Sequence, residues 1–144
     1  MRAIGTHLVL LELSDPPLKD KTVSLILNIL WLIFGGLPMA LGWLLASFIM
    51  AITIVGLPWT PAALRIAHYT LLPFGSRIDD SGAGSVSFFG NIVWFVLAGW
   101  WLAIGHLVLA ACLAITIIGL PFAWAHLKLA MLSLAPVGRS VVPA

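Results

Sequence analysis

Hydrophobic residues are gathered into two long blocks along the chain and do not alternate regularly with polar ones. The first block covers residues 23–72 and the second covers residues 86–137. The strongly polar side chains that interrupt these blocks are Arg65, His68, His106, His126 and Lys128. A helix needs about 20 apolar residues to cross the hydrocarbon core of a bilayer, so each block has room for two crossings. The pattern predicts at least two and up to four membrane spans.

The apolar runs inside the blocks favour helices over β-strands. Lipid offers the backbone no hydrogen-bonding partner, so a spanning segment must be a helix or part of a closed barrel. Barrel strands alternate between apolar and polar residues. Residues 29–34 and 107–111 are apolar throughout. We therefore expect helices in both blocks.

An internal repeat organises the chain. Shifting the sequence by 63 positions aligns AITIVGLP at residues 51–58 with AITIIGLP at residues 114–121. The same shift aligns other distinctive pairs, namely Asn28 with Asn91, Trp31 with Trp94, Gly36 with Gly99, and Arg65 with Lys128. Glycines, prolines, tryptophans and asparagines in register over such a length are not explained by apolar composition alone. The sequence therefore predicts two homologous copies.

The repeat divides the chain into four parts. They are an N-terminal arm (residues 1–22), a first membrane repeat (23–75), a polar linker (76–87) and a second membrane repeat (88–142). The linker is rich in Gly, Ser and Asp, which is typical of a flexible solvated segment. The arm lacks a small-residue cleavage site, so we expect it to remain as a cytoplasmic or interfacial segment.

Each copy is expected to begin with a long apolar helix opened by its asparagine, and to end with a shorter helix after a break. Proline lacks the N–H group and clashes with the preceding turn, so Gly-Leu-Pro is typical of such a break. The expected breaks lie at Gly56, Pro58, Gly119 and Pro121. The fold class that follows is an all-α membrane protein with two homologous helical repeats, comprising four transmembrane helices plus short interfacial helices.

Composition and charge agree with a membrane protein. Only 8% of the residues are charged and the mean hydropathy is +1.14, whereas soluble domains carry about 25% charged residues. The basic residues stand singly at the block ends, so no basic patch is available for nucleic acid. Four of them are expected to be interfacial anchors that reach lipid phosphates: Arg65, Lys128, Arg77 and Arg139. The seven tryptophans are typical of an aromatic belt at the membrane surface.

Two arrangements of the copies satisfy the hydrophobic pattern. If each copy is a hairpin, all basic residues can face the cytoplasm, as the positive-inside rule favours. If each copy crosses once, with its short helix in the interface, the copies form an inverted repeat. We favour parallel hairpins with both termini in the cytoplasm, because both copies end alike in Pro-x-Gly. The difficulty is that neither copy has a polar turn halfway along.

Four polar side chains inside or beside the blocks are candidates for a functional path. Asn28 and Asn91 could line such a path, but Asn more often caps a helix or bonds between helices. Thr53 and Thr116 could present hydroxyls to an ion at the broken helices, but such threonines usually bond back to their own helix. The structural interpretation is favoured for both pairs.

The sequence predicts no catalytic site, no metal site and no cofactor. The four histidines are not spaced at i and i+4 beside a carboxylate, as a helical metal site requires. The carboxylates lie in the arm and the linker, outside both apolar blocks. We therefore do not expect the paired acids or the activated nucleophile that hydrolysis or group transfer needs.

These residues resemble the YccF-type inner-membrane component domain family. The resemblance rests on an Asn-Ile-Leu/Val-Trp opening, an Ile-x-Gly-Leu-Pro break and the ending Pro-Val-Gly-Arg at residues 136–139, and it covers residues 28–142. It implies a bacterial inner-membrane protein with two transmembrane segments in each of two copies, and no established reaction. We expect a non-enzymatic accessory or structural component whose partners are the bilayer, other inner-membrane proteins or a second copy of itself. The alternative is an oligomeric channel or a subunit that transports an ion or small solute.

Overall fold

The computed structural model describes residues 18–82 and 84–144. Most of the expected N-terminal arm lies outside these residues. The first copy contains α2 (Leu18–Trp31), a π-helical turn (Leu32–Gly36), α3 (Leu37–Ile52), a short 3-10 turn (Leu57–Trp59), α4 (Thr60–Leu71) and β1 (Ser76–Asp79). The second contains α5 (Ser85–Trp94), a π-helical turn (Phe95–Gly99), α6 (Trp100–Ala114), α7 (Leu120–Leu134) and β2 (Ser140–Pro143).

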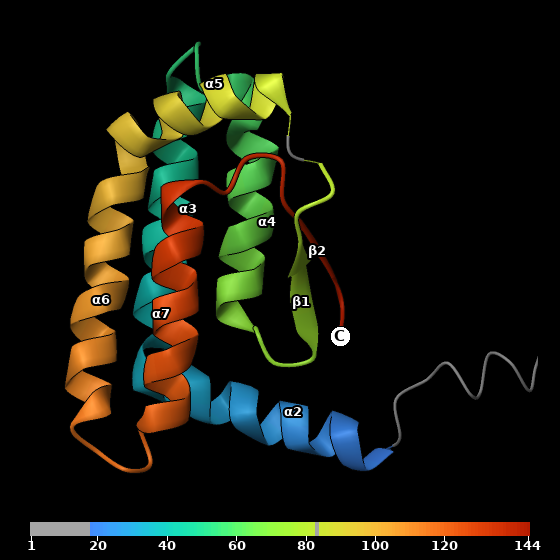
Figure 1. The fold of residues 1–144 in the computed structure, drawn as a ribbon, viewed down its shortest axis with the longest axis vertical. Coiled ribbons are helices and arrows are strands. Elements are labelled where there is room, and N and C mark those ends of the chain that lie inside the picture. Colours follow the sequence, from blue (N-terminus) through green and yellow to red (C-terminus); the bar gives the residue numbers. More distant parts are fainter. Residues whose placement is uncertain (1–17, 83) are drawn as a thin grey trace, which may run out of the picture.

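The helices form two layers that a small ribbon covers on one side. Helices α3, α4, α6 and α7 run along the long dimension of the molecule, whereas α2 and α5 lie across its opposite ends (Figure 1). Strands β1 and β2 pair antiparallel and lie beside α4. Two continuous helical stretches, Asp20–Ile52 and Ser85–Ala114, are long and apolar enough to cross a membrane by length and composition.

A sharp bend separates α2 from α3. In the π-helical turn between them, Phe34 leaves helical geometry and Gly35 takes φ +116°, a conformation that residues with a Cβ rarely adopt. The indole of Trp31 packs against Gly36 inside this bend, where a Cβ would overlap its ring. The bend directs the second half of the helix into the bundle, and the π-helical turn of the second copy lies at the corresponding bend between α5 and α6 (Figure 1).

Tryptophan donors tie each bend to the second helix of the same copy. The Trp31 indole N–H donates to the carbonyl of Thr70 at 2.7 Å, and the Trp94 indole N–H donates to the carbonyl of Ser133 at 2.7 Å. Both rings are fully buried, as is Trp43, which stacks on Trp94 with ring centroids 5.1 Å apart. The expectation of a surface belt is therefore wrong for these three tryptophans, because each fills the core.

The two asparagines form identical clamps. Asn28 Nδ2 donates to the carbonyl of Phe74 at 2.9 Å, and its Oδ1 accepts from the N–H of Phe74 at 3.0 Å. Asn91 makes the same pair of bonds with Val137, at 3.1 and 2.8 Å. Both asparagines lie well inside α2 and α5, so they do not cap helices as one interpretation expected. Each clamp thus fixes the segment after the last helix of a copy to the first helix of the same copy.

An approximate two-fold axis relates the copies. Ile78 pairs with Val141 in the ribbon, and these residues are 63 positions apart, which is the shift of the repeat. Trp43 donates to His106, another equivalent pair. Equivalent positions meet each other only where a two-fold axis passes between them. The axis therefore runs from the crossing of α3 and α6 to the centre of the ribbon.

The contacts where α3 crosses α6 are also related by the two-fold axis. A Cβ at Gly42 would meet Leu102 at 3.2 Å, and a Cβ at Gly105 would meet Met39 at 3.2 Å. Gly42 corresponds to Gly105, and Met39 to Leu102. Small residues at the crossing thus let the two helix backbones come together, as in packed membrane helices.

The direction of the two copies differs from the arrangement that we favoured. Each copy is a hairpin, but α3 and α6 run in opposite directions through the bundle (Figure 1). The hairpins therefore run in opposite directions, as in the inverted alternative, although each copy contributes two helices to the bundle. Neither alternative included the sharp bend between α2 and α3, which gives each copy two directions.

Charged side chains are segregated along the two-fold axis. Within the described part of the chain, they lie on the ribbon and the segment after β1, on α4 and α7, and at the start of α2. Those whose side chains the structure describes are Asp20, Lys21, Arg65, Arg77, Asp79, Asp80, Lys128 and Arg139. Helices α3 and α6 carry none, and their outer surfaces expose Leu41, Phe48 and Leu107. One end of the axis is polar and the other is apolar.

The register of the ribbon can be tested by a disulfide. In a Cys112→Ala background, Ile78→Cys with Val141→Cys should oxidise readily, because facing residues of antiparallel strands have Cα atoms about 4.5–5.5 Å apart, within the range for disulfides. Arg77→Cys with Val141→Cys is the matched control, whose side chains point to opposite faces. Intact mass after alkylation measures the free thiols. More complete oxidation of the control pair would contradict the register.

The clamps should contribute substantially to stability. Asn91→Leu deprives the N–H and carbonyl of Val137 of their partners, each loss costing about 1–3 kcal/mol, and Asn28→Leu should do the same at Phe74. Ser87→Ala, which removes an exposed bond to the carbonyl of Gly82, is the control and should change little. Denaturant unfolding of the purified protein measures the difference. Equal stability of Asn91→Leu and Ser87→Ala would contradict a structural clamp.

Candidate functional site

The threonines expected beside the helix breaks bond to their own chain. Thr53 Oγ1 donates to the carbonyl of Met50 at 2.9 Å, and Thr116 Oγ1 donates to the carbonyl of Leu113 at 3.0 Å. Thr116 Oγ1 also accepts from the N–H of Gly119 at 3.0 Å. The hydroxyls therefore shape the reversals that follow α3 and α6.

The Gly-Leu-Pro motifs lie where the chain reverses. Helix α3 ends at Ile52 and the next helical turn begins at Leu57, next to Pro58. A Cβ at Gly56 would come within 2.5 Å of Thr53 Oγ1, so the reversal is too tight for a larger residue. In the second copy α7 begins directly after Gly119, with Pro121 in its first turn. The chain at both reversals is apolar, and Ile54 and Ile117 are 86% and 87% exposed.

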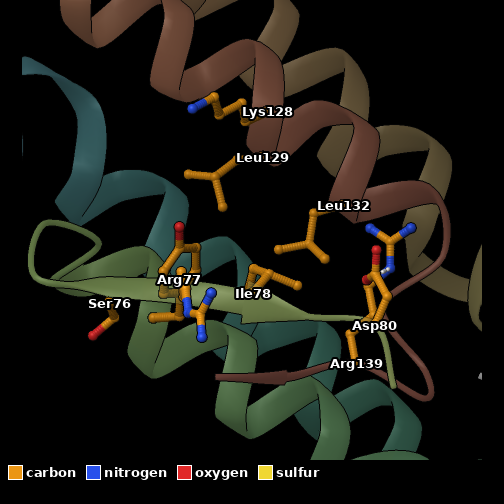
Figure 2. A pocket seen from close by; sticks show the side chains of 9 residues that line it. Ser76, Arg77, Ile78, Asp80, Lys128, Leu129, Leu132 and Arg139 are labelled. Atoms are coloured by element: carbon orange, nitrogen blue, oxygen red, sulfur yellow. Dashed lines mark ion pairs between the residues drawn. The ribbon is translucent and has the colours of Figure 1, made fainter. Parts of the chain in front are cut away.

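A polar groove lies between α7 and β1, close to the two-fold axis. Its volume is about 300 Å³. Lys128 lines it from α7, and Ser76 and Arg77 line it from β1 (Figure 2). Leu129 and Leu132 of α7 and Ile78 of β1 form its apolar floor. The groove thus combines cationic and hydroxyl groups with an apolar base.

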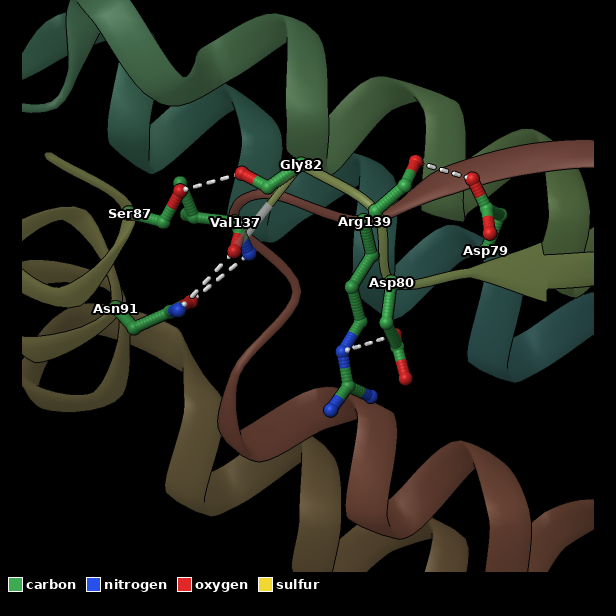
Figure 3. A network of polar contacts seen from close by, with 8 residues as sticks. Asp79, Asp80, Gly82, Ser87, Asn91, Val137 and Arg139 are labelled. Atoms are coloured by element: carbon green, nitrogen blue, oxygen red, sulfur yellow. Dashed lines mark hydrogen bonds and ion pairs between the residues drawn. The ribbon is translucent and has the colours of Figure 1, made fainter. Parts of the chain in front are cut away.

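An ion pair closes one end of this groove. Arg139 Nε lies 3.0 Å from a carboxylate oxygen of Asp80, and the pair joins the linker to the segment before β2 (Figure 3). Nearby, Ser81 donates to Asp79 and Ser87 donates to the carbonyl of Gly82. Together with the Asn91 clamp, these bonds fix the linker to the end of the second copy.

Of the four expected anchors, three line the groove and one does not. Lys128, Arg77 and Arg139 contribute to its wall. Arg65, which corresponds to Lys128, is exposed on α4 and does not line this groove. Equivalent basic positions therefore have different surroundings in the two copies.

A buried chain of hydrogen bonds crosses the core. The Trp43 indole N–H donates to His106 Nε2 at 3.2 Å, and the Nδ1 atoms of His106 and His126 lie 2.9 Å apart. His126 Nε2 lies 3.4 Å from the carbonyl of Phe34. Trp can only donate, so His106 must be protonated at Nδ1 and must donate to His126. His126 then carries its proton on Nε2, facing Phe34, and every ring nitrogen has a partner.

This chain breaks the symmetry of the repeat. His126 occupies the position of Ala63, and its Nε2 would lie 3.0 Å from a Cβ at Gly35. Gly35 corresponds to Ala98, which lies in a π-helical turn without positive φ. The imidazole of His126 therefore occupies the space that a side chain at position 35 would fill. Its Nε2 also faces the carbonyl of Phe34 in the bend, to which it can donate.

The histidine pair is a structural feature that the sequence interpretation missed. The sequence analysis did not pair them, because His106 and His126 are 20 residues apart and no motif links them. Their departure from the repeat was the available signal, since His106 aligns with Trp43 and His126 with Ala63. The pair offers two nitrogens, and no group of three or more His, Cys, Asp or Glu in residues 18–82 and 84–144 could hold a metal ion.

Comparison with known proteins gives a consistent result. A family described as the inner membrane component domain matches residues 26–76 and again residues 89–139, so the expectation of two tandem copies is confirmed. The inner membrane protein YccF of Escherichia coli (strain K12) and that of Shigella flexneri are each 35% identical to the chain over 127 residues. The match covers 81% of this chain and 86% of each relative. No solved structure matches. The chain therefore belongs to the YccF family of inner membrane component domains.

Proposed function

We propose that the chain is a non-enzymatic accessory component of the bacterial inner membrane, embedded through its α3–α6 side with its ribbon facing the cytoplasm. In this orientation the two-fold axis lies along the membrane normal. Both copies then enter and leave the bilayer on the same side, although they run in opposite directions within the membrane plane. The inner-membrane relatives and the family match support the location.

The segregation of charge is the observation that carries this orientation. The basic side chains Arg65, Arg77, Lys128 and Arg139 would all lie on the cytoplasmic side, as the positive-inside rule favours. The apolar surfaces of α3 and α6 would face lipid. The orientation retains the common sidedness that the similar ends of the two copies suggested.

The other simple orientation places the long bundle helices along the membrane normal. The ribbon, which lies beside the middle of the bundle, would then sit at the bilayer centre (Figure 1). Each of Arg77, Asp79, Asp80 and Arg139 would face a cost of about 2.5–3.5 kcal/mol at that depth. The strand edges would also lack hydrogen-bonding partners. Summed over these groups, the cost is comparable with the stability of a whole domain, which is about 5–15 kcal/mol.

The apolar reversals also favour an embedded, re-entrant arrangement. A turn that emerged on the far side of the membrane would contact water, yet Ile54, Val55, Ile117 and Ile118 are the exposed residues there. In the proposed orientation both reversals stay within the apolar layer. Irregular backbone at that depth needs internal partners, which Thr53 and Thr116 provide.

An accessory role is favoured over a channel by the partners of the candidate path residues. The side chains of these residues form hydrogen bonds to backbone groups of the same chain, at Asn28, Asn91, Thr53 and Thr116. The channel alternative retains one favourable observation, which is the buried chain that runs through His106 and His126. Other inner-membrane proteins or a second copy of the chain would be the partners of an accessory component.

Single-cysteine labelling tests the orientation. In a Cys112→Ala background, Ser81→Cys and Pro143→Cys should resist a membrane-impermeant maleimide in intact cells and react after permeabilisation. Ile54→Cys and Ile117→Cys should react poorly in both conditions, because lipid surrounds the reversals. Quantitative gel-shift labelling is the measurement. Labelling of either reversal from the periplasm, or of only one ribbon position, would contradict the proposal.

Ion flux separates the accessory role from the channel. Liposomes containing the pure protein should show no more proton or potassium flux than empty liposomes under an applied gradient. Thr53→Val and Thr116→Val are the informative variants, because they remove hydroxyls without changing side-chain size. Flux in the wild type that these variants abolish would favour the channel over the accessory role.

A further inference from the structure

The groove between α7 and β1 carries an excess of positive charge. Three basic side chains line it, namely Arg77, Lys128 and Arg139, against the single carboxylate of Asp80. Asp80 pairs with Arg139. In the part of the chain with described side chains, Arg77 and Lys128 form no ion pair, and both are exposed. Their charges are therefore available to a ligand.

The groups in the groove match the chemistry of a phosphate. Phosphate oxygens accept hydrogen bonds, and charge-assisted donors such as Lys and Arg bind them most strongly. Tyr69 adds a hydroxyl group to the lining. The floor of Leu129 and Leu132 is apolar, so it reduces competition from water beneath the donors.

The groove continues into a second cavity of a different character. This neighbouring cavity has a volume of about 230 Å³ and shares Tyr69, Ser76, Lys128 and Leu129 with the first. Its other walls include Phe74 and Trp124, and the Lys128 ammonium lies 5.7 Å from the centroid of the Trp124 ring. A cationic end that opens onto an aromatic one suits a ligand with an anionic head and a less polar body.

The groove lies across the two-fold axis, with residues of both copies in its lining. It contains both members of two equivalent pairs, which are Tyr69 with Leu132 and Ser76 with Arg139. Lys128 has its counterpart in Arg65, and Arg77 has its counterpart in Ser140, and neither counterpart lines the groove. The repeat therefore does not relate the basic side chains of the groove to one another.

We propose that the groove between α7 and β1 binds one phosphate-bearing anion per chain, held chiefly by Lys128 and Arg77 with Tyr69 as a further donor. The phosphate can belong to a lipid headgroup or to a soluble molecule. Under the orientation proposed above, the groove lies at the cytoplasmic surface of the membrane and is open to both sources. Binding itself rests on the groove and not on that orientation.

The test uses the full-length protein in a phosphate-free detergent. Native mass spectrometry measures binding of phosphatidylglycerol and of phosphatidylcholine with the same acyl chains. The wild type should bind one phosphatidylglycerol in preference to phosphatidylcholine. Lys128→Ala with Arg77→Ala should weaken this binding by about tenfold or more, because each basic group near an anionic phosphate contributes several-fold. Arg65→Ala, the repeat counterpart of Lys128→Ala, should bind like the wild type, and Lys128→Arg should retain binding.

Competition with inorganic phosphate distinguishes the sources. If phosphate fails to displace phosphatidylglycerol, the site is for a lipid headgroup. If phosphate displaces it from the wild type, the site is for a soluble anion. Equal binding of both lipids, or equal binding by the double variant and Arg65→Ala, would overturn the proposal. Because the assay is in detergent, its outcome is independent of the cysteine labelling that tests the orientation.

Discussion

The bend between α2 and α3, with its counterpart between α5 and α6, determines where the rest of the molecule lies. A straight helix of 33 residues would be about 50 Å long, whereas the hydrocarbon core is about 30 Å thick. The bend removes this mismatch because it divides each long apolar stretch into two shorter helices that lie across one another. It holds because the buried indole of Trp31 fills the inside of the turn and bonds to the backbone of α4.

The duplication then builds the molecule from this bent unit. Reciprocal contacts at the α3–α6 crossing and at Ile78 and Val141 bury the face that one copy alone would expose. The symmetry is broken in two places. His126 enters the core where Ala63 stands in the first copy, and the groove on the axis has basic side chains that the repeat does not relate to one another. The first departure completes the packing, and the second is the basis of the anion site that we propose.

The sequence predicted the repeat, the mainly helical fold, and an inner membrane component family. It did not predict the direction of the copies, because Gly35 and Gly36 are compatible with either a packed straight helix or a sharp bend. The clamp partners of Asn28 lie 46 residues away, beyond any local pattern. The histidine pair was missed for the same reason, since only the three-dimensional crossing brings His106 to His126. Long-range contacts of this kind depend on tertiary packing that periodicity does not encode.

The central claim is that the two-fold axis lies along the membrane normal, so that most helical residues run close to the membrane plane. Polarised infrared spectroscopy of the protein in aligned bilayers measures the mean orientation of the helices from the amide dichroism. The account predicts a mean helix direction inclined towards the membrane plane, because α3, α4, α6 and α7 lie in it and only α2 and α5 follow the normal. A mean direction close to the normal would contradict it.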